Sequence, residues 1–275
     1  MDFFSKISES VKFVSQRLRS NPAICVLIRK GSLDLNYVGS IHQKIPLQEI
    51  PHCDEIPLVS SISLYEVTIE GVSVLLLETP HQEVTPNTFE KLLYPIHIVA
   101  NLGIRCVVSS DELECFQFKL KNFDVLVIED HINLTGIHPF EKIQFTSEFS
   151  EKIQKINISY SNALREICKE ASIALSFDLK EATLIGIPNP RLLSVADKKL
   201  YESFQSDCLG NIHVLETIVA RYYSMIVCTI IVPKQLNEKN NSTMLNERRQ
   251  MINGILNFIL PKIYQYLASN SNEIY

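Results

Sequence analysis

The chain has 275 residues, of which 46% are hydrophobic and 21% are charged, and this balance excludes a mainly disordered protein. Its apolar runs, such as Val74–Leu77 and Ile226–Val232, are far shorter than the roughly 18 residues of a membrane-spanning helix. A net charge of −5 argues against a broad nucleic-acid surface, and the start MDFFSKISES lacks the features of a secretory signal, so we expect a cytoplasmic protein.

Helical and strand-like patterns alternate through the first half of the chain. In chain order they predict a helix over 1–20, a strand over 23–29, a hairpin of strands over 63–69 and 72–78, a helix over 89–100, and strands over 104–109 and 123–128. Glu70-Gly71 forms the expected hairpin turn, and Pro95 is expected to kink the helix that contains it.

The alternation continues in the second half. It predicts a helix over 160–171, a strand over 182–187, a helix over 214–222, a strand over 225–232, a polar loop over 234–245 and a C-terminal helix over 246–268. No internal repeat divides the chain. We therefore expect a single α/β domain over residues 1–275, with a mixed sheet and helices on both of its faces.

Metal and cofactor motifs do not occur in the sequence. The seven cysteines include no CxxC pair and the seven histidines include no HxxxH pair, so we expect no metal site and reduced, buried cysteines. Walker, GxGxxG and GxSxG motifs do not occur either, so we expect no cofactor.

Four segments together carry a resemblance to a known family. Residues 130–136 read DHINLTG, residues 216–221 read ETIVAR, residues 49–51 read EIP, and Tyr94-Pro95 lies in the helix before Leu102-Gly103. Taken in their order along the chain, they resemble segments of the trimeric purine nucleoside phosphorylases, and the resemblance runs from about residue 21 to residue 267.

The resemblance implies both a fold and a reaction. The fold is one α/β domain around a mixed, barrel-like sheet, usually in a homotrimer. The reaction is phosphorolysis of a nucleoside to a free base and ribose 1-phosphate. It requires a cradle of donors for phosphate, a hydrogen-bond donor at purine N7 and a carboxylate that grips the base.

The positions that bind phosphate in the family are substituted here. The glycine-rich loop Gly-Ser-Gly-Leu-Gly is replaced by Arg29–Leu33, in which Lys30, Gly31 and Ser32 are the candidate phosphate ligands. The second phosphate element corresponds to residues 79–86, where His81 is the candidate. The third, Asn-Ala-Ala-Gly-Gly, corresponds to 111–115 (DELEC), whose three acids disfavour an anion.

The base-binding positions are substituted as well. The run 189–194 (NPRLLS) replaces Gly-Pro-x-Phe-Glu-Thr, so Leu193 stands where the resemblance implies the base carboxylate. The candidates that remain for the base and sugar are Asn189, Asn211 and His213. Gln235 and Lys234 are the catalytic candidates, because they align with the Thr-Asn that supplies the N7 donor.

The scaffold segments are thus retained while the ligand positions are replaced. The resemblance therefore suggests a purine nucleoside phosphorylase-like pseudoenzyme, which acts as a binding or scaffold subunit in a homo-oligomer or with another protein. Two alternatives stay open: an active but divergent phosphorylase that takes a purine nucleoside and phosphate, and a nucleoside sensor without chemistry.

Overall fold

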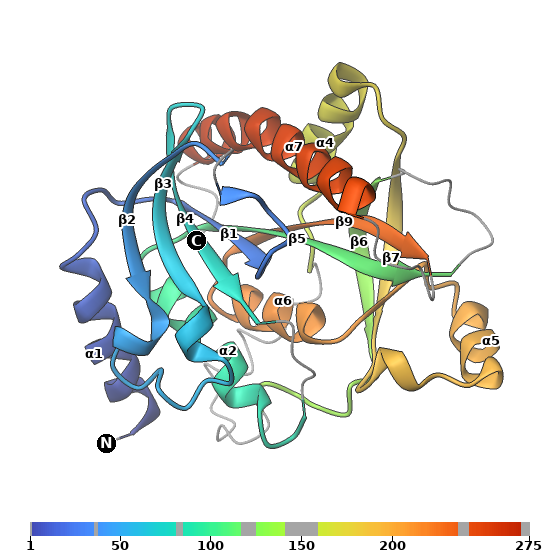
Figure 1. The fold of residues 1–275 in the computed structure, drawn as a ribbon, viewed down its shortest axis with the longest axis horizontal. Helices are drawn as coiled ribbons and strands as arrows, with labels where there is room; N and C mark the ends of the chain where they lie inside the picture. The colour runs from blue at the N-terminus through green and yellow to red at the C-terminus, as the bar shows by residue number, and fades with distance from the viewer. Residues whose placement is uncertain are drawn as a thin grey trace.

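The computed structural model describes residues 2–35, 38–80, 85–116, 125–140, 159–235 and 242–270, and its fold is drawn in Figure 1. The strands are β1 (Ile24–Arg29), β2 (Ser40–Pro46), β3 (Ser63–Ile69), β4 (Val72–Thr79), β5 (Cys106–Cys115), β6 (Val125–Asn133), β7 (Leu179–Gly186), β8 (Cys208–Gly210) and β9 (Ile226–Gln235). The helices are α1 (Phe3–Ser15), α2 (Phe89–Asn101), α4 (Asn162–Leu175), α5 (Val195–Ser203), α6 (Ile212–Tyr222) and α7 (Ser242–Ser269).

The sheet closes on itself along part of its length. Its described strands follow the order β2-β3-β4-β1-β5-β8-β7-β6-β9, and β9 also pairs with β5. Strands β5, β8, β7, β6 and β9 therefore form a ring, while β1 to β4 extend from β5 as an open sheet. The β1–β4, β1–β5 and β5–β9 pairs are parallel, whereas β2–β3, β3–β4 and β6–β9 are antiparallel. The prediction of a mixed, barrel-like sheet is confirmed.

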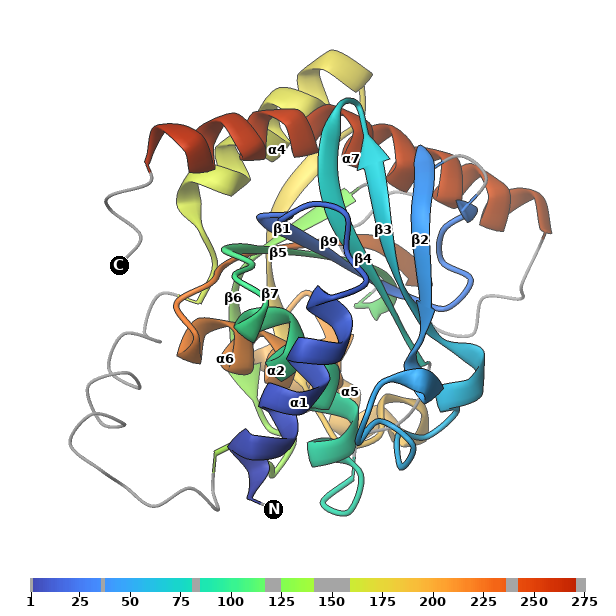
Figure 2. The ribbon, with the colours of Figure 1, turned by 90° about the vertical axis from the view of Figure 1, so that its left-hand side faces the viewer.

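Helices cover both faces of this sheet, as Figure 2 shows, with α4 and α7 on one side and α1, α2 and α6 on the other. The sequence of β1 explains why both faces are covered, because its successive side chains point to opposite sides. Cys25 and Leu27 join the core under α2 and α6, whereas Val26 and Ile28 join the core under α4 and α7. A strand whose first five residues are all apolar is thus buried on both faces.

The N-terminal helix is shorter than the predicted span of 1–20. It ends at Ser15 because the following segment bonds to the sheet instead of continuing the helix. The backbone N–H of Arg19 donates to one carboxylate oxygen of Glu66 at 2.8 Å, and the Ser20 hydroxyl donates to the other at 2.6 Å.

The predicted polar loop over 234–245 is also shorter in the structure. Strand β9 continues through Lys234 and Gln235, and α7 begins at Ser242, so residues 242–245 are helical. The predicted C-terminal helix over 246–268 forms the rest of α7, which accommodates Pro261 within its length.

Cysteine burial agrees with the sequence. All seven cysteines are buried and none forms a disulfide. Burial raises the pKa of the Cys53 thiol to about 12 and also raises that of Cys25 and Cys106. Within the described part of the chain, no helix combines the length and the apolar character that a membrane crossing requires.

Candidate functional site

A cleft of about 750 Å³ opens where β1, β4, β5 and β9 end. Because β1 pairs in parallel with both β4 and β5, and β5 with β9, the carboxyl ends of all four strands meet there. This is the place where α/β sheets usually bind ligands. The N-terminus of α6, with Asn211, Ile212 and His213, forms another wall.

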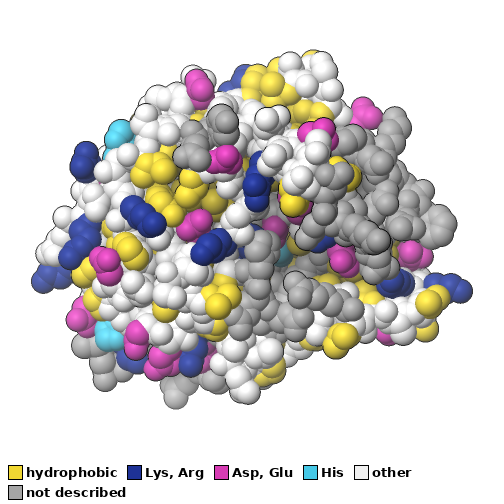
Figure 3. Space-filling view, viewed as in Figure 1, with side chains coloured by type: hydrophobic (Ala, Val, Ile, Leu, Met, Phe, Trp, Pro, Cys, Tyr) yellow, Lys and Arg dark blue, Asp and Glu magenta, His cyan; other side chains and the backbone are white. Residues whose placement is uncertain are grey.

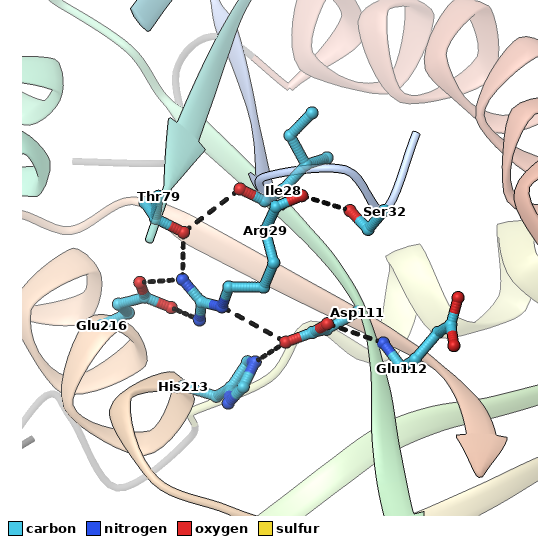
Figure 4. A network of polar contacts seen from close by, with 8 residues as sticks. All are labelled: Ile28, Arg29, Ser32, Thr79, Asp111, Glu112, His213 and Glu216. Atoms are coloured by element: carbon cyan, nitrogen blue, oxygen red, sulfur yellow. Dashed lines mark hydrogen bonds and ion pairs between the residues drawn. The ribbon is translucent and has the colours of Figure 1, made fainter. Parts of the chain in front are cut away.

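The floor of the cleft is occupied by the side chain of Arg29, the last residue of β1, as Figure 4 shows. Its Nη1 and Nη2 donate to the two carboxylate oxygens of Glu216 at 2.8 and 2.7 Å. Its Nε donates to Asp111 Oδ2 at 3.2 Å, and its Nη1 also donates to the hydroxyl of Thr79. Four elements, β1, β4, β5 and α6, therefore meet on one guanidinium.

This network is almost fully shielded from water. The side chains of Arg29, Asp111 and Glu216 are 4%, 4% and 3% exposed. Burial alone lowers the pKa of Arg29, but the carboxylates of Glu216 and Asp111 outweigh it and raise that pKa above its ordinary value. One guanidinium faces two carboxylates, so the network has a formal charge of −1 with His213 neutral.

His213 extends the network to the first turn of α6. Its Nε2 lies 2.8 Å from Asp111 Oδ2, and the ring is 6% exposed. A carboxylate oxygen can only accept, so Nε2 is the donor in this hydrogen bond, and in a neutral ring Nδ1 is then an acceptor. That Nδ1 is buried without a hydrogen-bond partner among the described residues.

The turn after β1 has its polar groups engaged in its own structure. The Ser32 hydroxyl and the Ser32 N–H both donate to the carbonyl of Arg29, at 2.7 and 2.9 Å. Gly31 adopts a φ of 83°, a left-handed conformation that favours glycine. Lys30, which lies between Arg29 and Gly31 in the sequence, is exposed and lines the cleft at its opening.

Asn211 presents a second buried acceptor to the cleft. Its Nδ2 donates to the carbonyl of Ile187 at 2.9 Å and to that of Pro188 at 2.5 Å, which fixes the orientation of the amide. Its Oδ1 is buried and has no hydrogen-bond partner among the residues that the structure describes.

Charged side chains of both signs surround the cleft opening. Lys30, Lys234 and Arg249 line it together with Glu112 and Glu114, and Figure 3 shows basic and acidic side chains side by side near the centre of one face. Burial raises the pKa of Glu112, although nearby Arg248, 3.4 Å away, acts in the opposite direction.

The predicted site residues are brought together in large part. Those that line the cleft are Lys30, Gly31, Ser32, Asn211, His213 and Lys234. Asn189 is not among the described lining residues, although the adjacent Pro190 is. His81 and the side chain of Gln235 lie outside the described residues. No three His, Cys, Asp or Glu side chains cluster as a metal site would require, within the ranges described.

Sequence reasoning missed the residues that dominate the cleft floor. It treated Asp111 only as one of three acids that disfavour an anion, and it gave Arg29 and Glu216 no role. One signal was available, because an arginine directly follows the five apolar residues of β1 and is expected to need a buried partner.

Known proteins are similar to this chain over most of its length. Purine nucleoside phosphorylase 1 of Bacillus subtilis is 23% identical, with 82% of this chain and 83% of the relative covered. The purine nucleoside phosphorylase of Bos taurus is 20% identical, with 93% of each chain covered. No family model matches the chain.

Solved structures give the same result for the fold. Two structures of Schistosoma mansoni purine nucleoside phosphorylase, one complexed with a monocyclic inhibitor and one with BCX-34, superpose with TM-scores of 0.73 and 0.76. Both are 16% identical and cover 92% of this chain and 96% of theirs.

Proposed function

Because this chain is a divergent member of the purine nucleoside phosphorylase family, we propose that it has kept the family's cleft without its phosphorolysis. In this proposal the protein is a pseudoenzyme that binds a nucleoside in the cytoplasm and acts as a binding or scaffold subunit. The observation that carries the proposal is the buried pairing of Arg29 with Glu216 and Asp111 on the cleft floor.

Arg29 stands where the family's phosphate loop has its first glycine. A glycine leaves room for an anion, whereas Arg29 fills the end of β1 with a side chain. Four donations to Glu216, Asp111 and Thr79 use most of the five N–H groups of its guanidinium. Arg29 is therefore already paired within the protein and does not offer its charge to a phosphate at the end of β1.

The charge of the floor also opposes phosphate. A phosphate dianion entering beside a buried network of charge −1 would meet repulsion in a region of low dielectric constant. Removal of a single transition-state donor typically lowers turnover by about 10²–10³-fold. Here the phosphate loop, the neutral turn at Asp111 and the base carboxylate are all changed.

The position of the base carboxylate supports the same conclusion. Leu193, which replaces it, packs against a small apolar cluster that contains Phe116, Ile185 and Leu209. Its side chain serves packing and offers no hydrogen bond to a purine. The remaining acceptors in the cleft, Asn211 Oδ1 and His213 Nδ1, suit the hydroxyls of a ribose better than the chemistry at N7.

The proposal includes an oligomer, a trimer by resemblance to the family or an assembly with another protein. Leu192 and Val195, at the start of α5, are 79% and 71% exposed, which suits residues that a partner covers. Light scattering on the purified protein tests this part. A strictly monomeric protein at micromolar concentration would remove the homo-oligomer from the proposal.

Phosphorolysis by the purified protein is the direct test of the proposed function. Inosine, guanosine, adenosine and uridine are incubated separately with phosphate at high protein concentration, and free base is measured by chromatography. A Lys30→Ala, Gln235→Ala double variant, purified in the same way, reports any contaminating host phosphorylase. We expect equal, background release from both proteins. Phosphate-dependent release by the wild type alone would establish an active divergent phosphorylase instead.

A further inference from the structure

We propose that the cleft binds a nucleoside 5′-monophosphate, with its nucleoside toward the floor and its phosphate on three cations at the opening. The inference rests on the proposed nucleoside-binding function and adds a class of ligand to it. It follows from the charges of one cavity, whose floor is formally negative and whose opening is formally positive.

The opening carries cations that are not paired with carboxylates in the described structure. Lys30 follows β1, Lys234 lies near the end of β9 and Arg249 lies in the first half of α7, and all three line the cleft. The backbone N–H of Lys30 donates to the carbonyl of Thr79, but the ammonium group of neither lysine forms a hydrogen bond or a close ion pair with a described residue. These cations are hereafter called the rim cations.

Arg249 is held in place by the turn after β1. Its Nε donates to the carbonyl of Gly31 at 2.9 Å, and its Nη2 would lie 3.9 Å from a Cβ at Gly31. The guanidinium therefore rests on the residue that follows Lys30 in sequence. Its Nη1 and Nη2 groups form no described hydrogen bond and provide the planar donor pair that suits a phosphate.

The acids near the rim do not cancel these cations. Glu112 lies 3.4 Å from Arg248, and Glu114 is the other carboxylate that lines this part of the cleft. Glu78, which lies in electrostatic reach of Lys30, accepts a hydrogen bond from Tyr65. Among the residues that line the rim, three cations and two carboxylates leave a formal charge of +1.

The floor has the opposite character. With His213 neutral, the Arg29 network carries a formal charge of −1, and the buried atoms Asn211 Oδ1 and His213 Nδ1 are acceptors without a partner among the described residues. Buried acceptors of this kind are stabilised by a ligand that brings donors. Ribose hydroxyls and base N–H groups are neutral donors, whereas an anion would be repelled.

One molecule that satisfies both ends has a neutral, donor-rich part and a terminal phosphate. A nucleoside 5′-monophosphate has this order, and a cleft of about 750 Å³ lies within the usual range for small-molecule sites. Inorganic phosphate has no neutral part for the floor, and a nucleoside has no anion for the rim. Each is therefore expected to bind more weakly than the nucleotide.

Calorimetric titration of the full chain tests this inference. The probes are AMP, GMP and IMP, their three nucleosides, and inorganic phosphate. We expect at least one nucleotide to bind about tenfold or more tightly than its own nucleoside, because a hydrogen bond to a charged group contributes about that factor. The advantage should shrink as the salt concentration rises.

Single substitutions locate the phosphate. Lys30→Ala and Arg249→Ala should each weaken nucleotide binding about tenfold and leave nucleoside binding unchanged. Lys262→Ala is the matched control, because Lys262 is an α7 cation that pairs with Glu170 away from the cleft. Circular dichroism spectra of the variants verify that they fold.

Each outcome gives a decision. Three results overturn the inference: equal affinity for nucleotide and nucleoside, no binding of either, or an equal loss of nucleotide affinity in Lys30→Ala, Arg249→Ala and Lys262→Ala. If a nucleoside binds, no nucleotide binds more tightly and no base is released, the inference fails alone. If neither ligand binds and no base is released, the nucleoside-binding part of the proposed function fails with it, and the absence of phosphorolysis stands. If phosphate-dependent release occurs, the proposed function fails, and the nucleotide preference is still decided by the titration.

Discussion

Replacing Arg29 by alanine tests whether the buried network is what holds the cleft floor in its present form. The change removes the only cation that contacts both Glu216 and Asp111 among the described residues, and leaves two carboxylates that are 3% and 4% exposed. Removing one partner of a buried pair typically costs about 3–5 kcal/mol, because the remaining charge has neither water nor a counterion. We expect a loss in that range.

The assay is urea unfolding at pH 7.5, with the free energy extrapolated to water. Lys262→Ala is the matched control, because its pair with Glu170 has the same short distance, 2.8 Å, but the two side chains are 40% and 57% exposed. Exposed pairs contribute about 0–1 kcal/mol, so the control should lose little.

A double-mutant cycle separates the ion pair from the lost volume. Glu216→Ala should also be strongly destabilising, but the Arg29→Ala, Glu216→Ala double variant should lose less than the sum of the two. A coupling of about 1–3 kcal/mol is expected for groups in direct contact. Additive losses, or an Arg29→Ala loss no larger than that of Lys262→Ala, would refute the reasoning.

Three further predictions concern stability and thiol chemistry. Burial lowers the pKa of His97 to about 4, so the unfolded chain binds the proton more readily. The contribution of neutral His97 to the free energy of unfolding is complete above pH 6.5 and is lost as the pH falls toward 4, by up to about 3 kcal/mol. The free energy of unfolding of His97→Gln, measured in urea, should therefore depend less on pH than that of the wild type. Gly39→Ala should destabilise the protein severely, because the φ of Gly39 is 100° and a Cβ there would lie 2.2 Å from the Thr68 carbonyl oxygen. Gly254→Ala should instead stabilise the protein by up to about 1 kcal/mol in thermal unfolding, because a Cβ at this position in α7 meets open space. The seven buried cysteines should react with a thiol reagent only after denaturation, and rapid reaction of the native protein would contradict their burial.

The sequence predicted those elements that bury an apolar face. Periodicity placed β1, β3, β4, α2 and α6 within a few residues of their observed bounds. It missed β2, whose first residues are exposed at the edge of the sheet, and α5, which has no buried residue. It also missed β8, which has three residues. Such elements depend on their neighbours and carry no apolar pattern of their own.

The cleft was predictable only in part, for a related reason. Alignment with family segments placed Lys30, Asn211 and His213 near one site, and the structure brings them together. The pairing of Arg29 with Glu216 joins residues 187 positions apart, and nothing local to either residue specifies it. Substitution of ligands can be seen in a sequence, but what fills the space that they leave requires the tertiary structure.

If the cleft has lost the family's phosphate site, as we propose, the network would prevent a single change from restoring it. Glu216 belongs to a retained family segment, whereas Arg29 and Asp111 stand where the family has glycine and asparagine. Arg29→Gly alone would vacate the end of β1 but leave two buried carboxylates, so the floor would become more negative than it is now. Asp111→Asn alone would leave the guanidinium paired with Glu216. The combination would open the space and leave Glu216 as the one charge of the three, so the formal charge of the floor would stay at −1. Arg29 and Asp111 offset each other, which indicates that the two substitutions are stabilising as a pair.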